Sequence, residues 1–181
     1  MININLSGND LYIEGATNEN ILGGKFRNFS GEERRDPDSN RIVNSKGTRN
    51  FNFRIPDEYL DLFKEMGCNI KSYGGNPEEG EAPIYFVKVN INTETSKRPP
   101  KIHLIKKNNK LEELQVASYN KVDGMFIINA DMKISVYRKY DTPSLYLNFA
   151  VIKQQLDPIS EKYSDMMDTD GIDPNETDYM E

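Results

Sequence analysis

Basic residues alternate with aromatic residues along several short segments of the chain, and this combination suits contact with a polynucleotide. Lysine and arginine neutralise phosphates along an extended backbone, and the flat faces of phenylalanine and tyrosine stack on bases. Every base has such a face, so binding of this kind depends little on sequence. The residues predicted to contact nucleic acid are Lys25, Arg27, Phe29, Arg34, Arg35, Arg49, Phe53, Arg54, Phe86, Lys88, Arg98, Lys101, His103, Lys106, Lys107, Lys133 and Tyr137.

The densest run of positive charge is SKRPPKIHLIKKNNK, from Ser96 to Lys110, which holds six basic residues and no acid. Scattered surface lysines and arginines are also the ordinary state of a folded domain, so an ordinary solvated surface is the alternative interpretation. Phe51 and Phe53 share one face of a predicted strand, so at least one of them is expected in the core.

Catalytic and metal-binding patterns are missing from the sequence. His103 is the only histidine and lies among lysines, and Cys68 is the only cysteine. The sequence contains no P-loop, no GxGxxG and no GxSxG. In the segment DTDGIDPNE, Gly171 comes too early for a calcium loop of standard spacing. We therefore expect neither an enzyme nor a bound metal or cofactor.

The elements that must position the predicted contacts are mostly strands. Alternating apolar and polar residues predict strands at 10–16, 21–29, 49–55, 68–71, 83–91, 101–106, 126–136 and 145–152. In the seventh of these, Phe126 and Ile128 are expected on the same buried face as Ala130, Met132, Ile134 and Val136.

One helix is expected between Pro56 and Gly67, at about 57–66, because proline suits a first turn and glycine suits a C-cap. A second helix of two turns is possible at 111–119, and 30–49 is expected to be a long mobile loop or an extended hairpin. The order predicts a mainly β fold of antiparallel strands, either a small barrel or a sandwich, for which the five-stranded OB barrel with an inserted helix is one frame.

The length of 181 residues fits one domain at 1–156 followed by an acidic tail at 157–181. One cysteine excludes an internal disulfide framework, and no apolar run approaches a membrane span. The first residues resemble no signal peptide. We expect a soluble protein of the cytoplasm.

The tail carries the negative charge of the protein. Residues 157–181 contain nine acids and one base, so their charge is −8, whereas the whole chain is at −6 and the remainder is therefore at +2. We expect this segment to be flexible. One interpretation is that it only aids solubility. The other is that it folds over a basic groove or binds partners, through Asp165, Asp168, Asp170, Asp173, Glu176, Asp178, Tyr179 and Glu181.

Five segments in order resemble a family of small phage-encoded single-stranded DNA-binding proteins. They are FRNFSG (26–31), TRNFNFRI (48–55), EMGCNIK (65–71), IYFVKVNI (84–91) and RPPKIHLI (98–105). The resemblance covers most of residues 20–155. It implies an OB barrel and sequence-tolerant binding of single-stranded DNA during phage replication or recombination, in the host cytoplasm. By the matching positions, Arg27, Phe29, Arg49, Phe53, Arg98 and Lys101 would lie near the cleft.

The end of the chain departs from that family, because such tails typically finish in an aromatic residue or Pro-Phe, whereas this one finishes Asp178-Tyr179-Met180-Glu181. Two alternatives stay open. A phage structural or assembly protein fits the composition, and so does an inhibitor whose acidic end mimics DNA, although an inhibitor does not need the basic run at 97–110.

Overall fold

The computed structural model describes residues 1–155 and 159. The predicted partner-binding residues of the tail, from Asp165 to Glu181, lie outside the described residues. The strands are β1 (Asn3–Ser7), β2 (Asp10–Ala16), β3 (Arg27–Asn28), β4 (Arg34–Arg35), β5 (Ile42–Asn44), β6 (Arg49–Arg54), β7 (Lys71–Tyr73), β8 (Ile84–Ile91), β9 (Lys101–Ile105), β10 (Leu111–Glu113), β11 (Ile127–Tyr137) and β12 (Ser144–Gln154). The helices are α1 (Leu60–Glu65) and α2 (Asn120–Asp123), with 3-10 turns η1 (Gly24–Phe26), η2 (Asp57–Tyr59), η3 (Pro77–Glu79) and η4 (Val116–Ser118).

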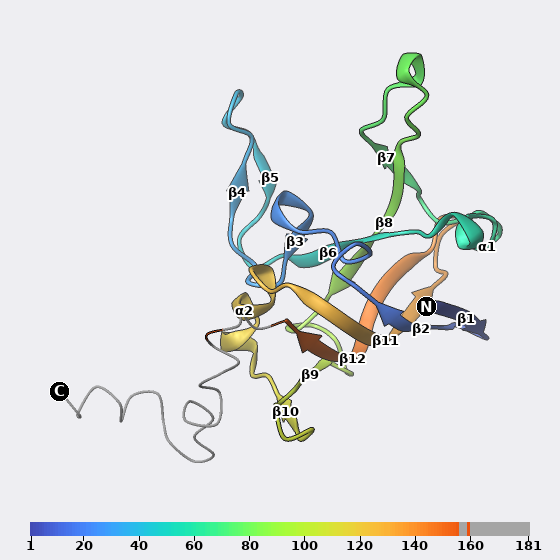
Figure 1. The fold of residues 1–181 in the computed structure, drawn as a ribbon. Helices are drawn as coiled ribbons and strands as arrows, with labels where there is room; N and C mark the ends of the chain where they lie inside the picture. Colours follow the sequence, from blue (N-terminus) through green and yellow to red (C-terminus); the bar gives the residue numbers. More distant parts are fainter. Residues whose placement is uncertain (156–158, 160–181) are drawn as a thin grey trace.

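The strands form one large curved sheet and a separate hairpin (Figure 1). Along the main path the order is β1-β2-β11-β12-β8-β6-β3, while β7 joins β8, and β9 joins β12 and β10. The predicted mainly β fold is therefore confirmed. The described strands do not close into a barrel, so the closed five-stranded barrel is not observed.

Two pairings in the sheet are parallel, contrary to the antiparallel order expected from the sequence. β12 runs parallel to β9 from Phe149 to Ile152, and it meets β8 in parallel at Tyr146. Both pairings join segments that are distant in sequence, so no turn signal predicts them. The sheet divides at β12, with β8 beside the first half of this strand and β9 beside the second.

The core lies on the concave side of the sheet and is closed by α1. Phe51 and Phe53 of β6 point inward, and Phe53 stacks on Phe63 of α1 with ring centroids 6.1 Å apart. The predicted helix is confirmed as η2 followed by α1, and Gly67 after it has a φ of 80°, the left-handed conformation that suits a C-cap. No helix in the described residues is long and apolar enough to cross a membrane.

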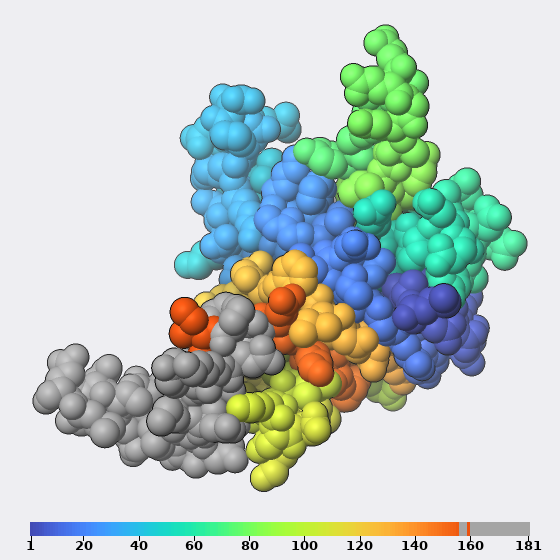
Figure 2. Space-filling view, viewed as in Figure 1, coloured from blue at the N-terminus to red at the C-terminus, as the bar shows by residue number. Residues whose placement is uncertain are grey.

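Two arms rise from the same side of the sheet. The hairpin β4–β5 stands on one side, and the extension of β7 and β8 that carries η3 stands on the other (Figure 1). The space-filling view shows a hollow between them (Figure 2). Of the two structures expected for 30–49, the extended hairpin is the one observed.

In the second half of the chain, local predictions were wrong at two places. Residues 111–119 form β10 and η4, not a helix of two turns, because β10 pairs with β9. In β11 a register shift between Ile127 and Asn129 turns Phe126 and Ile128 outward, to exposures of 56% and 43%, and buries Ile127 instead. From Ala130 onward the predicted buried face is correct.

Candidate nucleic-acid interface

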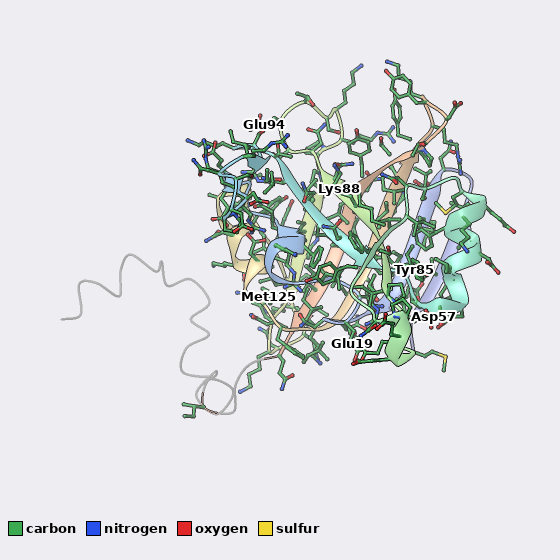
Figure 3. All side chains as sticks on the ribbon, turned by 90° about the horizontal axis from the view of Figure 1, so that it is seen from above. Glu19, Asp57, Tyr85, Lys88, Glu94 and Met125 are labelled. Atoms are coloured by element: carbon green, nitrogen blue, oxygen red, sulfur yellow. The ribbon has the colours of Figure 1, made fainter. Side chains whose placement is uncertain are left out.

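A groove of about 1280 Å³ lies between the two arms. The hairpin β4–β5 forms one wall, with Arg34 and Val43 lining it. Phe26 of η1 and Lys71 of β7 line the opposite side. The floor is the outer face of β6 and β8, where Lys88 lies between the arms when seen from above (Figure 3).

An aromatic cluster covers one side of this groove. The ring of Phe26 makes edge contacts with Phe86 below it, at a centroid distance of 5.3 Å, and with Tyr73, at 5.2 Å. Phe86 is buried, Phe26 is half-buried and Tyr73 is 50% exposed. The ammonium of Lys25 lies 4.6 Å from the Tyr73 centroid and 5.2 Å from that of Phe26. The ammonium therefore lies over an exposed ring in a cation–π contact, which brings a group that binds phosphate next to an aromatic side chain.

Polar side chains of β6 fasten the groove to its walls. Asn52 donates a hydrogen bond from Nδ2 to the carbonyl of Phe26 at 3.0 Å, which holds η1 over the floor. Asn50 donates to the side-chain oxygen of Asn44 on β5 at 3.3 Å, which holds the hairpin. These contacts pre-organise the two walls before any ligand arrives.

The lysines of the groove carry charge that is less compensated than that of its arginines. Within the described residues no carboxylate lies within 4.0 Å of Lys71 or Lys88, and both side chains are exposed. Arg34 and Arg35 each pair with a neighbouring glutamate at 3.2 Å, Glu32 and Glu33 respectively. The lysines therefore contribute more to attracting a polyanion than the two arginines do.

Four predicted contact residues have their side chains inside the protein, so they are corrected to structural roles. Phe29 stacks on Phe51 with centroids 5.4 Å apart, Phe53 belongs to the core, and Phe86 is covered by Phe26. Arg27 is only 2% exposed. For Arg27 and Phe29 the prediction failed because 21–29 is not one continuous strand: the turn η1 interrupts it, and Arg27, Asn28 and Phe29 are all buried after it.

The burial of Arg27 is compensated because hydrogen-bond acceptors of the protein surround its guanidinium group. It donates to the carbonyls of Leu22, Ile21, Val122 and Met125 at 2.5–3.2 Å, and to the side-chain oxygen of Asn18 at 3.1 Å. Burial lowers the pKa of Arg27, and the nearby carboxylate of Asp123 opposes that shift. The side chain therefore joins β3 to α2 beneath the groove.

Arg49 and Arg54 lie outside the groove. Arg49 shares the inward face of β6 and is half-buried, and it donates to the hydroxyl of Thr93 at 3.1 Å. Its side chain packs against Gly31, where an added Cβ would lie 3.2 Å from the Cγ of Arg49. Arg54 is exposed and borders a smaller hollow of about 330 Å³, together with Met1 and Asp57.

The other predicted residues are grouped elsewhere. Lys101 and His103 lie on the outer side of β9, and Lys133 and Tyr137 lie on the outer side of β11. Arg98 is exposed in the loop before β9, and Lys106 and Lys107 lie in the turn between β9 and β10. Of the predicted set, the groove brings together only Lys25, Arg34, Arg35 and Lys88 as accessible side chains.

Sequence reasoning missed Phe26 and Lys71, which line the groove, and Tyr73, whose ring contacts Phe26 beside it. Lys71 and Tyr73 alternate on β7, one residue apart, and this spacing was the available signal. Phe26 gave no such signal, because its orientation depends on η1. Among the described residues no group of three or more His, Cys, Asp or Glu side chains is placed to hold a metal ion.

The chain is similar to a known protein family. Residues 10–173 match the family described as "Putative phage ssDNA-binding domain". No curated protein and no solved structure matches the chain. The family match spans well over half of the sequence, from β2 to beyond β12. The chain therefore belongs to the phage single-stranded DNA-binding domain family.

Proposed function

We propose that this protein binds single-stranded DNA with little sequence preference, and that the groove between the β4–β5 and β7–β8 arms holds the strand. The observation that carries the proposal is the cluster of Lys25, Phe26 and Tyr73 beside Lys71 and Lys88. The exposed ring of Tyr73 beside the groove can stack only on a base whose face is free, and duplex DNA keeps those faces covered by neighbouring bases. The arrangement therefore favours a single strand over a duplex.

We also propose that the protein protects and organises single strands during phage replication or recombination, and is not an enzyme. The acidic tail would compete with DNA for the groove, because its charge of −8 complements the lysines there. Bound DNA would displace the tail and free it to meet replication or recombination proteins. An OB-like origin of the curved sheet, and cytoplasmic location, belong to the same proposal.

The groove is tested by fluorescence anisotropy with labelled oligo(dT), the matching duplex and oligo(U), at two salt concentrations. Tyr73→Ala should weaken single-strand binding about 5- to 100-fold, the loss of one stacked base, whereas Tyr140→Ala should not, although Tyr140 is 73% exposed. Lys88→Ala should reduce the salt slope by about 0.7, the contribution of one phosphate contact on a single strand. Lys64→Ala on α1 is its matched control. Equal binding by Tyr73→Ala and Tyr140→Ala would contradict the groove assignment.

The tail is tested separately by deleting Asp165 to Glu181 and comparing thermal melting to check that the body is intact. Removing an internal competitor should raise single-strand affinity and flatten the salt response. An unchanged affinity at low salt would refute the competitor mechanism and leave the groove assignment untouched.

A further inference from the structure

A second row of aromatic and basic side chains crosses the outer face of the sheet, outside the groove. Tyr12 of β2 lies opposite Lys133 of β11, Lys133 lies opposite Phe149 of β12, and Phe149 lies opposite Lys101 of β9. Ring, cation, ring and cation therefore alternate across four neighbouring strands. At a strand spacing of about 4.8 Å the row is about 14 Å long.

The side chains of this row are available to a ligand. Tyr12 and Phe149 are each 38% exposed, and Lys101 is exposed. His103 is two residues after Lys101, on the same face of β9. Its imidazole packs against Phe149 with ring centroids 5.1 Å apart. The ammonium of Lys133 lies 6.0 Å from the Tyr12 centroid. Phe149 thus has a lysine on each side, and Tyr12 has one beside it.

A β-bulge produces this exposure. The register between β11 and β12 shifts between Lys133 and Ile134, so that Leu147 and Ala150 point into the core while Phe149 between them points outward. Without the extra residue, Phe149 would follow the inward alternation of Leu145 and Leu147. The sequence thus places a large apolar ring at the surface where the fold could have buried it.

The outer face is continuous with the groove. Lys88 and Asn90 share the outer face of β8, and Asn90 lies opposite Tyr146 of β12, while its amide donates to the carbonyl of Leu145 at 3.1 Å. Tyr146 makes an edge contact with Tyr137 of β11, at 6.4 Å between centroids, and precedes Phe149 by three residues on β12. A strand leaving the groove at Lys88 can follow this surface without crossing the core.

The positive charge of the row favours a nucleic-acid strand over a protein as the ligand of this surface. Lysine is depleted from the centres of protein–protein interfaces, whereas aromatic residues alternating with cations suit a nucleic-acid strand. One carboxylate weakens this charge, because Asp10 lies 4.0 Å from Lys133. The nearby Asp131 is engaged in accepting the backbone N–H of Gly15 at 2.9 Å.

We propose that the row formed by Tyr12, Lys133, Phe149 and Lys101 is a second binding segment for the same single-stranded DNA, which long strands reach and short strands do not. This inference rests on the proposed function of the groove. It predicts that the protein holds a long strand in two consecutive segments, the first between the arms and the second across β12 and β11.

The test measures affinity for oligo(dT) from about 4 to about 24 nucleotides, a span that exceeds the site size of about 4–16 nucleotides common for single-strand-binding folds. Phe149→Thr and Tyr12→Thr keep strand-forming residues and should weaken binding of the longest oligonucleotides about 5- to 100-fold each, with the shortest bound as before. Thr95→Ala in the loop after β8 serves as a control, and thermal melting checks the fold of each variant.

A gain of affinity gives a second readout that unfolding cannot imitate. Asp10→Asn removes the carboxylate beside Lys133 and should tighten long-strand binding about 2- to 3-fold at low salt, with the short strand unaffected. Ultraviolet crosslinking with mass spectrometry should join peptides containing Tyr12 or Phe149 to long oligo(dT) only.

The outcomes are separable. If no oligonucleotide binds at any length, the proposed function of the groove fails and the second segment fails with it. If the variants of the row match the unmodified protein at every length, the groove stands and the second segment is refuted. Equal loss on short and long strands, or loss of self-association in light scattering without loss of DNA affinity, would also overturn it.

Discussion

Arg27 and Asp123 are 96 positions apart in the sequence, and each binds the backbone beside the other. The guanidinium of Arg27 donates to the carbonyls of Val122 and Met125, at 3.0 and 2.8 Å, on either side of Asp123. The carboxylate of Asp123 accepts the backbone N–H groups of Phe29 and Ser30, at 2.6 and 3.1 Å, just after Arg27. This reciprocal clasp fixes the start of the β4–β5 arm, and thereby one wall of the groove.

Arg27→Met is therefore expected to destabilise the protein strongly. The methionine keeps much of the side-chain volume but leaves buried carbonyls without a donor and the Asp123 carboxylate without its opposite charge, which should cost about 3–5 kcal/mol. Urea denaturation, monitored by circular dichroism, measures this loss of unfolding free energy. Arg41→Met in the exposed hairpin is the control and should change stability by less than about 0.5 kcal/mol. A cost for Arg27→Met under about 1 kcal/mol would contradict the clasp.

A pair of adjacent glycines tests the β7–β8 arm. Gly74 and Gly75 both have positive φ angles, 69° and 80°. A Cβ added at Gly75 would lie 2.6 Å from the nitrogen of Pro83, whereas at Gly74 nothing lies within 4 Å. Gly74→Ala should cost only about 1–2 kcal/mol of left-handed strain, and Gly75→Ala should cost about 1–3 kcal/mol more. Because Tyr73 precedes this turn, Gly75→Ala should also weaken DNA binding more than Gly74→Ala, as measured by melting and anisotropy. Equal losses would show that the arm tolerates the clash.

Local patterns predicted the elements well where neighbours in sequence decide the structure. Pro56 and Gly67 bracket the observed helix, and the alternation in β6 correctly places Phe51 and Phe53 together on one face. In β8 the alternation predicts a buried face of Tyr85, Val87, Val89 and Ile91, and all of these are buried except Tyr85, which is half-buried.

Patterns failed where one residue changes the alternation or where the partner is distant. The bulge in β11 turns Ile128 outward against the prediction, because the alternation rule does not allow for an extra residue. A bulge in β12 likewise turns Phe149 outward. The sequence suggests a surface cation at Arg27, because four of the five groups that accept its hydrogen bonds are backbone carbonyls. Every residue has such a carbonyl, so the sequence does not show which ones will surround Arg27. The groove likewise depends on η1, which places Phe26 on Phe86.

The turn of the β4–β5 arm should loosen in acid. The Asp36 carboxylate accepts the backbone N–H groups of Asp38 and Ser39 at 2.8 and 3.1 Å, and these bonds lower the pKa of Asp36. A depressed folded pKa stabilises the turn above the unfolded pKa of about 3.9, and that stabilisation is lost as pH falls through the lower folded pKa. Amide hydrogen exchange of Asp38 and Ser39 should therefore show less protection, after correction for intrinsic rates, at the lowest pH. Asp36→Asn keeps an acceptor without the charge and should abolish the pH dependence; a dependence that persists would assign it to another carboxyl group.

Tyr119 should make the protein sensitive to alkali. Its hydroxyl is buried and donates to the carbonyl of Pro100 at 3.3 Å, at the point where the chain enters β9 and its Lys101. Burial raises the pKa of Tyr119, Glu113 raises it further, and Arg49 opposes them. A phenol whose folded pKa is raised contributes full stability below the unfolded pKa of about 10 and loses it as pH rises towards the folded pKa, because the unfolded chain releases its proton first.

Tyr119→Phe should cost about 1 kcal/mol at neutral pH through the lost hydrogen bond. Its unfolding free energy should then fall less steeply above about pH 10 than that of the unmodified protein, which urea titrations at several pH values can measure. The lysines titrate in the same range and affect both proteins alike, so the difference between the two curves isolates Tyr119. Parallel curves would mean that the phenol ionises as readily in the folded protein as in the unfolded chain.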